Sequence, residues 1–158
     1  MTRLLLFISL LSINAFAKEY NLQWYVKSET TENLEYDEST SYGTTNAKGP
    51  WEDSLGNFGS LDCAGIFGLD NNKDVVNVNC IGIDNNNNKF SVNMRRVSEQ
   101  NIGLGKVTYL KGTGKYNLMI GKVCNYAVNY SNGYGFYKQK CKLDDKAFEG
   151  LNENNKVD

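Results

Sequence analysis

The side chains best suited to bind a ligand are tyrosines that alternate with polar residues along short, strand-like segments. A tyrosine has a large apolar ring and a hydroxyl group that needs a partner when it is buried. Tyrosines that converge around a guanidinium group suit a small apolar, aromatic or carboxylate-bearing molecule. The candidate ligand-binding residues are Tyr109, Tyr126, Tyr130, Tyr137 and Arg96, which share the apolar side of their segments, and Trp51, which lies in a turn-rich stretch.

A filled core explains the same residues without a ligand. The interior of an eight-stranded barrel is only just wide enough for its own side chains. In that case the tyrosine hydroxyls bond to one another or to Arg96, and Trp51 plugs one end of the domain. The sequence leaves both interpretations open.

The catalytic chemistry that this chain can support is narrow. It contains no histidine, which removes the commonest general base and every histidine-dependent triad. Glu52, Asp53 and Asp62 lie close in sequence, but acids in a loop are typical of a solvated surface. We identify no catalytic residue and expect no cofactor; an enzyme of this kind would be a cofactor-free isomerase or cyclase.

The sequence predicts no metal site. Its four cysteines form no Cys-x-x-Cys motif, so their spacing does not fit zinc. The stretch Asp70–Asp74 has oxygen-bearing side chains at alternate positions, as in the first half of a calcium loop. However, it lacks the glycine and the glutamate that such a loop needs further along, and the same residues suit a hairpin turn.

The N-terminus has the pattern of an export signal. Arg3 precedes an apolar run from Leu4 to Phe16, and Ala15-Phe16-Ala17 is a small-residue cleavage signal. We predict cleavage after Ala17, a secreted or periplasmic protein, and two disulfides, since the four cysteines all follow that site. An uncleaved anchor is the alternative. No second apolar run is long enough to suggest a transmembrane segment in the mature chain.

The overall charge suggests neither nucleic acid nor an anionic membrane as a partner. Without Arg3, 18 acidic residues face 16 basic ones, whereas such partners require a basic patch. The oligomeric state is left open.

One hairpin is predicted over Lys122–Lys142. Its turn is Asn132-Gly133, the strongest short-range hairpin signal, because a type I′ turn needs positive φ at both central residues. Counting outward from this turn sets Cys124 opposite Cys141 in a pair whose Cα atoms approach closely.

A second hairpin joins Leu61–Asp70 to Lys73–Asp84 through Asn71-Asn72, and the same count sets Cys63 opposite Cys80. Each bridge closes a short loop, worth roughly 3 kcal/mol in the chain-entropy model. Bridges between the two hairpins remain the alternative.

Three further strands are expected: Lys18–Lys27 from its aromatic and β-branched residues, and Lys89–Arg96 and Leu104–Lys111 from their alternation of apolar and polar residues. The acidic, Ser/Thr-rich stretch Ser28–Gly49 is expected to be a long loop with at most a short edge strand. The polar residues 143–158 are expected to be a flexible tail, with no more than one helical turn.

The fold class predicted is all-β: a small antiparallel up-and-down β-barrel of about eight strands, braced by two hairpin disulfides. A barrel is favoured over a sandwich because the strands follow one another without the long return connection of a Greek key. The barrel is expected to occupy residues 18–142 as a single domain.

The stretch Gly112-Thr-Gly-Lys-Tyr116, followed by Gly121, resembles an element of dirigent proteins and of allene oxide cyclase-like barrels. In that superfamily the element is a strand end, a tight glycine turn and a kinked re-entry into the next strand. The resemblance covers residues 105–131 and implies an eight-stranded antiparallel barrel, often with an apolar cavity, in secreted or plastid proteins. Dirigent proteins steer radical coupling and the cyclases close a ring, but none of their functional pocket residues matches a position here.

The sequence thus predicts a secreted or periplasmic barrel that binds a small hydrophobic or aromatic molecule. A structural or protein-interaction barrel with a filled core is the alternative.

Overall fold

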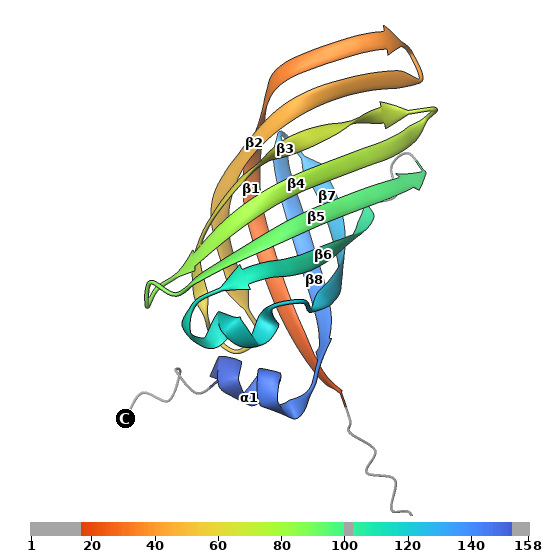
Figure 1. The fold of residues 1–158 in the computed structure, drawn as a ribbon. Coiled ribbons are helices and arrows are strands. Elements are labelled where there is room, and N and C mark those ends of the chain that lie inside the picture. The colour runs from red at the N-terminus through yellow and green to blue at the C-terminus, as the bar shows by residue number, and fades with distance from the viewer. Residues whose placement is uncertain (1–16, 100–102, 153–158) are drawn as a thin grey trace, which may run out of the picture.

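The computed structural model describes residues 17–99 and 103–152 (Figure 1). The expected signal peptide, apart from Ala17, and residues 153–158 of the expected tail lie outside the described residues. Within the described part of the chain, no helix is both long enough and apolar enough to cross a membrane.

The molecule is a closed barrel of eight antiparallel strands, in which each strand pairs with the next along the chain and the last pairs with the first. This confirms the predicted fold class. The strands are β1 (Lys18–Asp37), β2 (Thr40–Asp53), β3 (Phe58–Asp70), β4 (Lys73–Asp84), β5 (Lys89–Glu99), β6 (Leu104–Gly112), β7 (Val123–Ser131) and β8 (Tyr134–Leu143).

The two cysteine hairpins have the predicted registers. Asn71, Asn72, Asn132 and Gly133 all have positive φ, between 51° and 78°, as a type I′ turn requires. Cys63 is bonded to Cys80, with Cα atoms 4.0 Å apart. Cys124 is bonded to Cys141, with Cα atoms 4.5 Å apart. Each disulfide therefore braces its own hairpin, and the hairpins are not bridged to each other.

The expected loop at Ser28–Gly49 is wrong, because these residues form the far end of the β1–β2 hairpin. Leu34 lies opposite Tyr42 in the ladder, and a register shift between Thr30 and Glu32 accommodates one extra residue. In this outer part of the hairpin the strands contain threonines, whose branched side chains favour strands, where the inner part has apolar core residues. Few apolar residues are needed here because β8 pairs with β1 only as far as Lys27, and the β1 side chains beyond that point are exposed.

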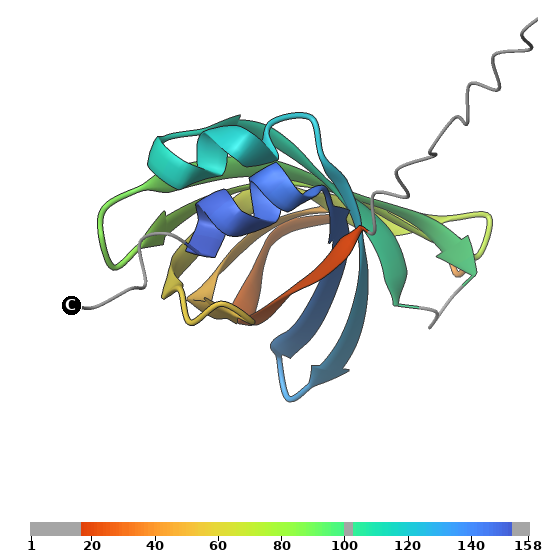
Figure 2. The same ribbon diagram turned by 90° about the horizontal axis from the view of Figure 1, so that it is seen from below.

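The expected flexible tail is also wrong for residues 145–152, which form the helix α1 (Asp145–Asn152). The Asp144 carboxylate accepts a hydrogen bond of 2.9 Å from the backbone N–H of Ala147, and so caps the first turn. Ala147 and Leu151 are buried. Figure 2 shows α1 beside a short 3-10 helix, η1 (Gly114–Met119), across one end of the barrel.

The Gly112–Tyr116 element departs from the form that the resemblance implies. Gly112 does end β6, but the chain then forms η1 before β7 begins at Val123, so there is no direct re-entry into a strand. Tyr116 and Met119 of η1 are buried, which makes this segment part of the barrel's closure.

Aromatic rings fill the end of the barrel that η1 and α1 cover. The Phe90 ring lies 5.3 Å from Trp51, 5.0 Å from Tyr116 and 5.7 Å from Tyr109, measured between centroids. All four side chains are at most 1% exposed. This end, called the closed end below, is solid, as the filled-core interpretation expects.

Candidate functional site

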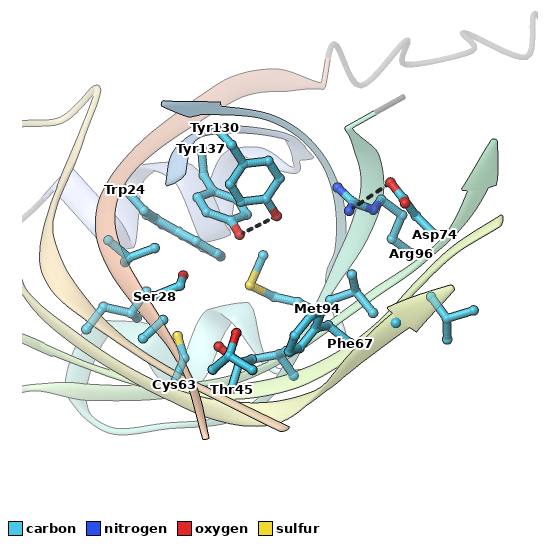
Figure 3. A pocket seen from close by; sticks show the side chains of 18 residues that line it. Trp24, Ser28, Thr45, Cys63, Phe67, Asp74, Met94, Arg96, Tyr130 and Tyr137 are labelled. Carbon is cyan, nitrogen blue, oxygen red and sulfur yellow. Dashed lines mark hydrogen bonds and ion pairs between the residues drawn. The ribbon is translucent and has the colours of Figure 1, made fainter. Parts of the chain in front are cut away.

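The other half of the barrel contains a cavity of about 260 Å³ that opens to solvent. It is lined by the parts of the strands that lie away from α1, such as Ser28 late in β1, Asp74 early in β4 and Tyr130 at the end of β7. Figure 3 shows this cavity and the side chains around it. The barrel therefore has a filled half and a half that contains a cavity.

One wall of the cavity is aromatic. Trp24 of β1 lies opposite Tyr137 of β8 in the ladder, and their ring centroids are 5.8 Å apart. The hydroxyl oxygens of Tyr130 and Tyr137 lie 3.1 Å apart, and Figure 3 shows the two rings side by side. Inward-facing positions alternate along each strand, so the adjacent strands β1, β8 and β7 bring these rings together.

Two phenols, Tyr137 in the aromatic wall and Tyr126 behind it, are neutral at physiological pH. Burial raises the pKa of Tyr126 to about 12, and it also raises the pKa of Tyr137 well above its usual value. Both hydroxyl groups therefore remain protonated and can donate or accept a hydrogen bond.

The opposite wall holds an ion pair. Nη2 of Arg96 on β5 lies 3.1 Å from Oδ2 of Asp74 on β4, and the Arg96 side chain is only 7% exposed. The guanidinium carbon lies 6.0 Å from the centroid of the Tyr130 ring, within the range of a cation–π interaction. Nε of Arg96 is buried without an acceptor among the described residues, which leaves one donor of the guanidinium unused.

The candidate residues from the sequence divide into two groups. Tyr130, Tyr137 and Arg96 line the cavity. Tyr126 does not line it but supports it, with its ring 5.7 Å from that of Tyr137.

Tyr109 and Trp51 lie in the closed end and do not line the cavity. The hydroxyl oxygen of Tyr109 accepts a hydrogen bond from Gln139, and the Trp51 indole donates one to the carbonyl of Ser60. Trp51 is part of β2 and is buried in the closed end, where the filled-core interpretation expects it. Alternation in the sequence shows which side of a strand a residue takes but not its depth along the barrel axis, and this is why Tyr109 was included; Trp51 was included because its stretch is rich in turn residues.

Trp24 and Asp74 are among the cavity residues that the sequence reasoning missed. Trp24 lies on the same side of β1 as Leu22 and Val26, and all three are buried. Its inward direction could therefore have been predicted from the alternation of the strand. Asp74 lies on the same side of β4 as Val76 and Val78, but its position beside the hairpin turn suggested a solvated carboxylate.

A second polar cluster lies in the closed end. Nζ of Lys115 is 3.2 Å from Oδ2 of Asp84, and both side chains are at most 1% exposed. The ammonium group also donates to Oδ1 of Asn57. Burial raises the pKa of Asp84, but hydrogen bonds from Asn88, Lys115 and the Asn86 backbone outweigh it, so the pKa is lowered overall. This cluster is closed off from solvent and joins η1 to the end of β4.

Within the described residues, no group of three or more histidine, cysteine, aspartate or glutamate side chains is placed to hold a metal ion. No known protein family, curated protein or solved structure matches this chain.

Proposed function

We propose that this protein binds a small hydrophobic or aromatic molecule in the cavity at the open end of its barrel. The observation that carries the proposal is a cavity of about 260 Å³ that opens to solvent. An eight-stranded barrel is small enough for its own side chains to fill the interior, so this cavity is not simply a consequence of barrel size. Ligand pockets for drug-sized molecules usually measure about 300–1,000 Å³. A cavity slightly below that range suits a molecule of one or two rings.

The cavity walls favour an aromatic body with a polar substituent. Trp24, Phe67 and Tyr137 offer ring faces and edges for stacking. The unused Nε–H of Arg96 would be satisfied by an oxygen atom on the ligand once the guanidinium turns toward it. Recognition by few polar groups on a mostly apolar wall is typical of small-molecule sites.

A secreted or periplasmic location fits this proposal. Disulfides persist in oxidising compartments, and all four cysteines are bonded in this protein. The N-terminal export pattern and the likeness to dirigent-type barrels with apolar cavities support the same proposal.

The proposal is tested with the fluorescent dye 1-anilinonaphthalene-8-sulfonate, which combines two ring systems with an anionic group. Ala47 is buried and lines the cavity, so Ala47→Phe places a phenyl ring inside it. Asn46→Phe adds the same ring at the neighbouring exposed position and serves as the matched control. Circular dichroism verifies that both variants are folded.

We expect the wild-type protein and Asn46→Phe to bind one equivalent of dye with similar affinity, and Ala47→Phe to bind at least about tenfold more weakly, about 1.4 kcal/mol. Because Trp24 lines the cavity and Trp51 does not, Trp51→Phe should retain the quenching of tryptophan emission by the dye. Equal dye affinity in Ala47→Phe and wild type would show that the cavity is not the binding site.

A further inference from the structure

The formal net charge of −1 conceals a strong segregation of charge along the sequence. Residues 89–143 contain ten lysines and arginines and one acidic residue, whereas residues 19–84 contain twelve carboxylates and three lysines. Because the strands are neighbours in the order of the chain, these sequence halves become halves of the barrel. One half, β5–β8, is basic and the other, β1–β4, is acidic.

A basic face covers the outside of β5–β8, and we define it as the five exposed side chains Arg95, Lys106, Lys138, Lys140 and Lys142. Arg95 lies directly opposite Lys106 in the ladder, and like charges in that position destabilise a sheet. Among the described residues, Lys140 alone of the five has an ion-pair partner, Glu19 at 3.1 Å. The near-neutral total charge therefore did not reveal this basic face.

An acidic arm lies at the far end of the β1–β2 hairpin, and we define it as residues 28–47. It contains five carboxylates and no lysine or arginine. Within the described residues, its one ion pair is the 3.8 Å contact between Glu29 and Lys27 at its base. Leu34 and Tyr36 near its tip are 73% and 87% exposed. The β2 strand of the arm is paired with β3 along its length, whereas the β1 strand of the arm lies beyond Lys27, the last β1 residue that pairs with β8.

We propose that the acidic arm of one copy of this protein binds the basic face of a second copy. The two surfaces are complementary in charge, and no ion pair joins them within one molecule among the described residues. Both also carry exposed apolar side chains, Leu34 and Tyr36 on the arm and Leu104 and Val123 beside the basic face. The acidic half of the molecule repels a long polyanion, which favours a second copy over an anionic polymer.

The geometry of the contact determines what can assemble. The arm and the basic face are different surfaces, so two copies either exchange arms reciprocally or join head to tail into a ring or a chain. Exposed charges are screened over about 10 Å at 0.1 M salt. Association through these surfaces is therefore expected to be strong at low salt and to disappear at high salt.

The test uses size-exclusion chromatography with light scattering over a range of protein concentrations, at about 20 mM and about 500 mM salt. The face-reversed variant is Lys106→Glu with Lys138→Glu, and the arm-reversed variant is Glu32→Lys with Glu35→Lys. The control, Asp62→Lys with Asp70→Lys, makes the same charge change as the arm-reversed variant but outside the arm.

We expect the wild type and the control to associate at low salt and to be monomeric at high salt, and each reversed variant to be monomeric in both. An equimolar mixture of the two reversed variants should associate again, because each reversed surface then meets an opposite charge. A wild type that stays monomeric at low salt, or reversed variants that still self-associate, would overturn the proposal. If the wild type is monomeric but binds heparin through the basic face, the occupant is an anionic polymer instead.

Discussion

Lys115 carries a charged group into the part of the molecule that is most thoroughly shielded from water. Its side chain and that of Asp84 are at most 1% exposed. Removing two charges from water offsets much of their attraction. The pair therefore adds little net stability over an apolar pair of the same shape, but each member depends strongly on the other.

We expect Asp84→Asn to lower the free energy of unfolding by about 3–5 kcal/mol, because it leaves the Lys115 ammonium buried without its counter-ion. Lys115→Met should be destabilising as well, and the double variant Asp84→Asn with Lys115→Met should lose less than the sum of the two. Urea denaturation followed by circular dichroism measures all three. Strict additivity would show that the two groups are not coupled.

The pKa of Asp84 gives the same pair an acid dependence. Burial opposes ionisation of this carboxyl group, but its hydrogen bonds lower the pKa overall. The stabilising contribution is therefore present above the unfolded-state pKa of about 3.9 and is lost as the pH falls through the folded value. Asp84→Asn should lose less stability on acidification than the wild type does.

Individual side chains show where sequence reasoning succeeds and where it stops. The inward direction of Tyr109, Tyr130 and Arg96 followed from alternation, and all three do face the interior. The division of these residues between a solid end and a hollow end could not be predicted. It depends on η1 and α1 covering one end, and nothing in the alternation of a strand shows which end a helix will cover.

At the scale of elements, α1 shows how a short helix can be decided by tertiary contacts. A helix of eight residues is marginal on its own in water, so a sequence of this length gives little local signal. Here Asp144 caps it, and Leu151 is fully buried against the closed end. The helix exists because the barrel supplies an apolar surface for it.

We expect Leu151→Ala to destabilise the protein by about 2–5 kcal/mol, the usual cost of a cavity left by a buried leucine. Lys146→Ala, at an exposed position on the same helix, should be nearly neutral. Binding of 1-anilinonaphthalene-8-sulfonate to folded Leu151→Ala should equal that of the wild type, because the cavity lies in the other half of the barrel. Loss of dye binding in folded Leu151→Ala would show that the two ends are not independent.

The hairpins differ in how readily the sequence reveals them. The Asn132-Gly133 and Asn71-Asn72 turns were sufficient to set two registers correctly, because a tight turn fixes which residues lie opposite one another, and the cysteine pair in each hairpin agrees with that register. The β1–β2 hairpin has neither such a turn sequence nor a cysteine pair. Its turn is Glu38-Ser39, and its outer half lies beyond the apolar core, so the low apolar content that suggested a loop indicates only that the strands leave the core.

At the scale of the whole molecule, the buried tyrosines link folding to alkaline pH. Burial raises the pKa of Tyr20, Tyr109, Tyr116 and Tyr137 above the usual value. The folded state therefore keeps these protons when the unfolded chain, with tyrosine pKa near 10, releases them. The contribution of these tyrosines to the free energy of unfolding is therefore fully present below a pH of about 10 and is lost as the pH rises above it.

We expect the ultraviolet absorbance of phenolate from these four residues to appear together with the loss of near-ultraviolet circular dichroism. Tyr109→Phe removes one linked group, so its stability should fall less steeply with rising pH. Ionisation of all tyrosines while the folded circular dichroism spectrum persists would contradict this expectation.

The separation of acidic and basic residues is visible in the sequence, but a net charge summed over the whole chain does not show it. Counting acidic and basic residues over the whole chain gives near neutrality. The same count taken separately over residues 19–84 and 89–143 would have shown two oppositely charged halves, because consecutive strands of an up-and-down barrel remain neighbours in space.

Because each strand pairs with the next along the chain, the order of synthesis determines when each strand edge becomes paired. Seven of the eight strand pairings join consecutive strands, but β1 pairs with β8 across the length of the domain, from Lys18↔Leu143 to Lys27↔Tyr134. During synthesis, β1 therefore keeps one edge of backbone N–H and C=O groups open until β8 emerges. An open edge can accept a strand from another chain, so until its own β8 is made, β1 of one copy is able to pair with the β8 of a copy that is already complete.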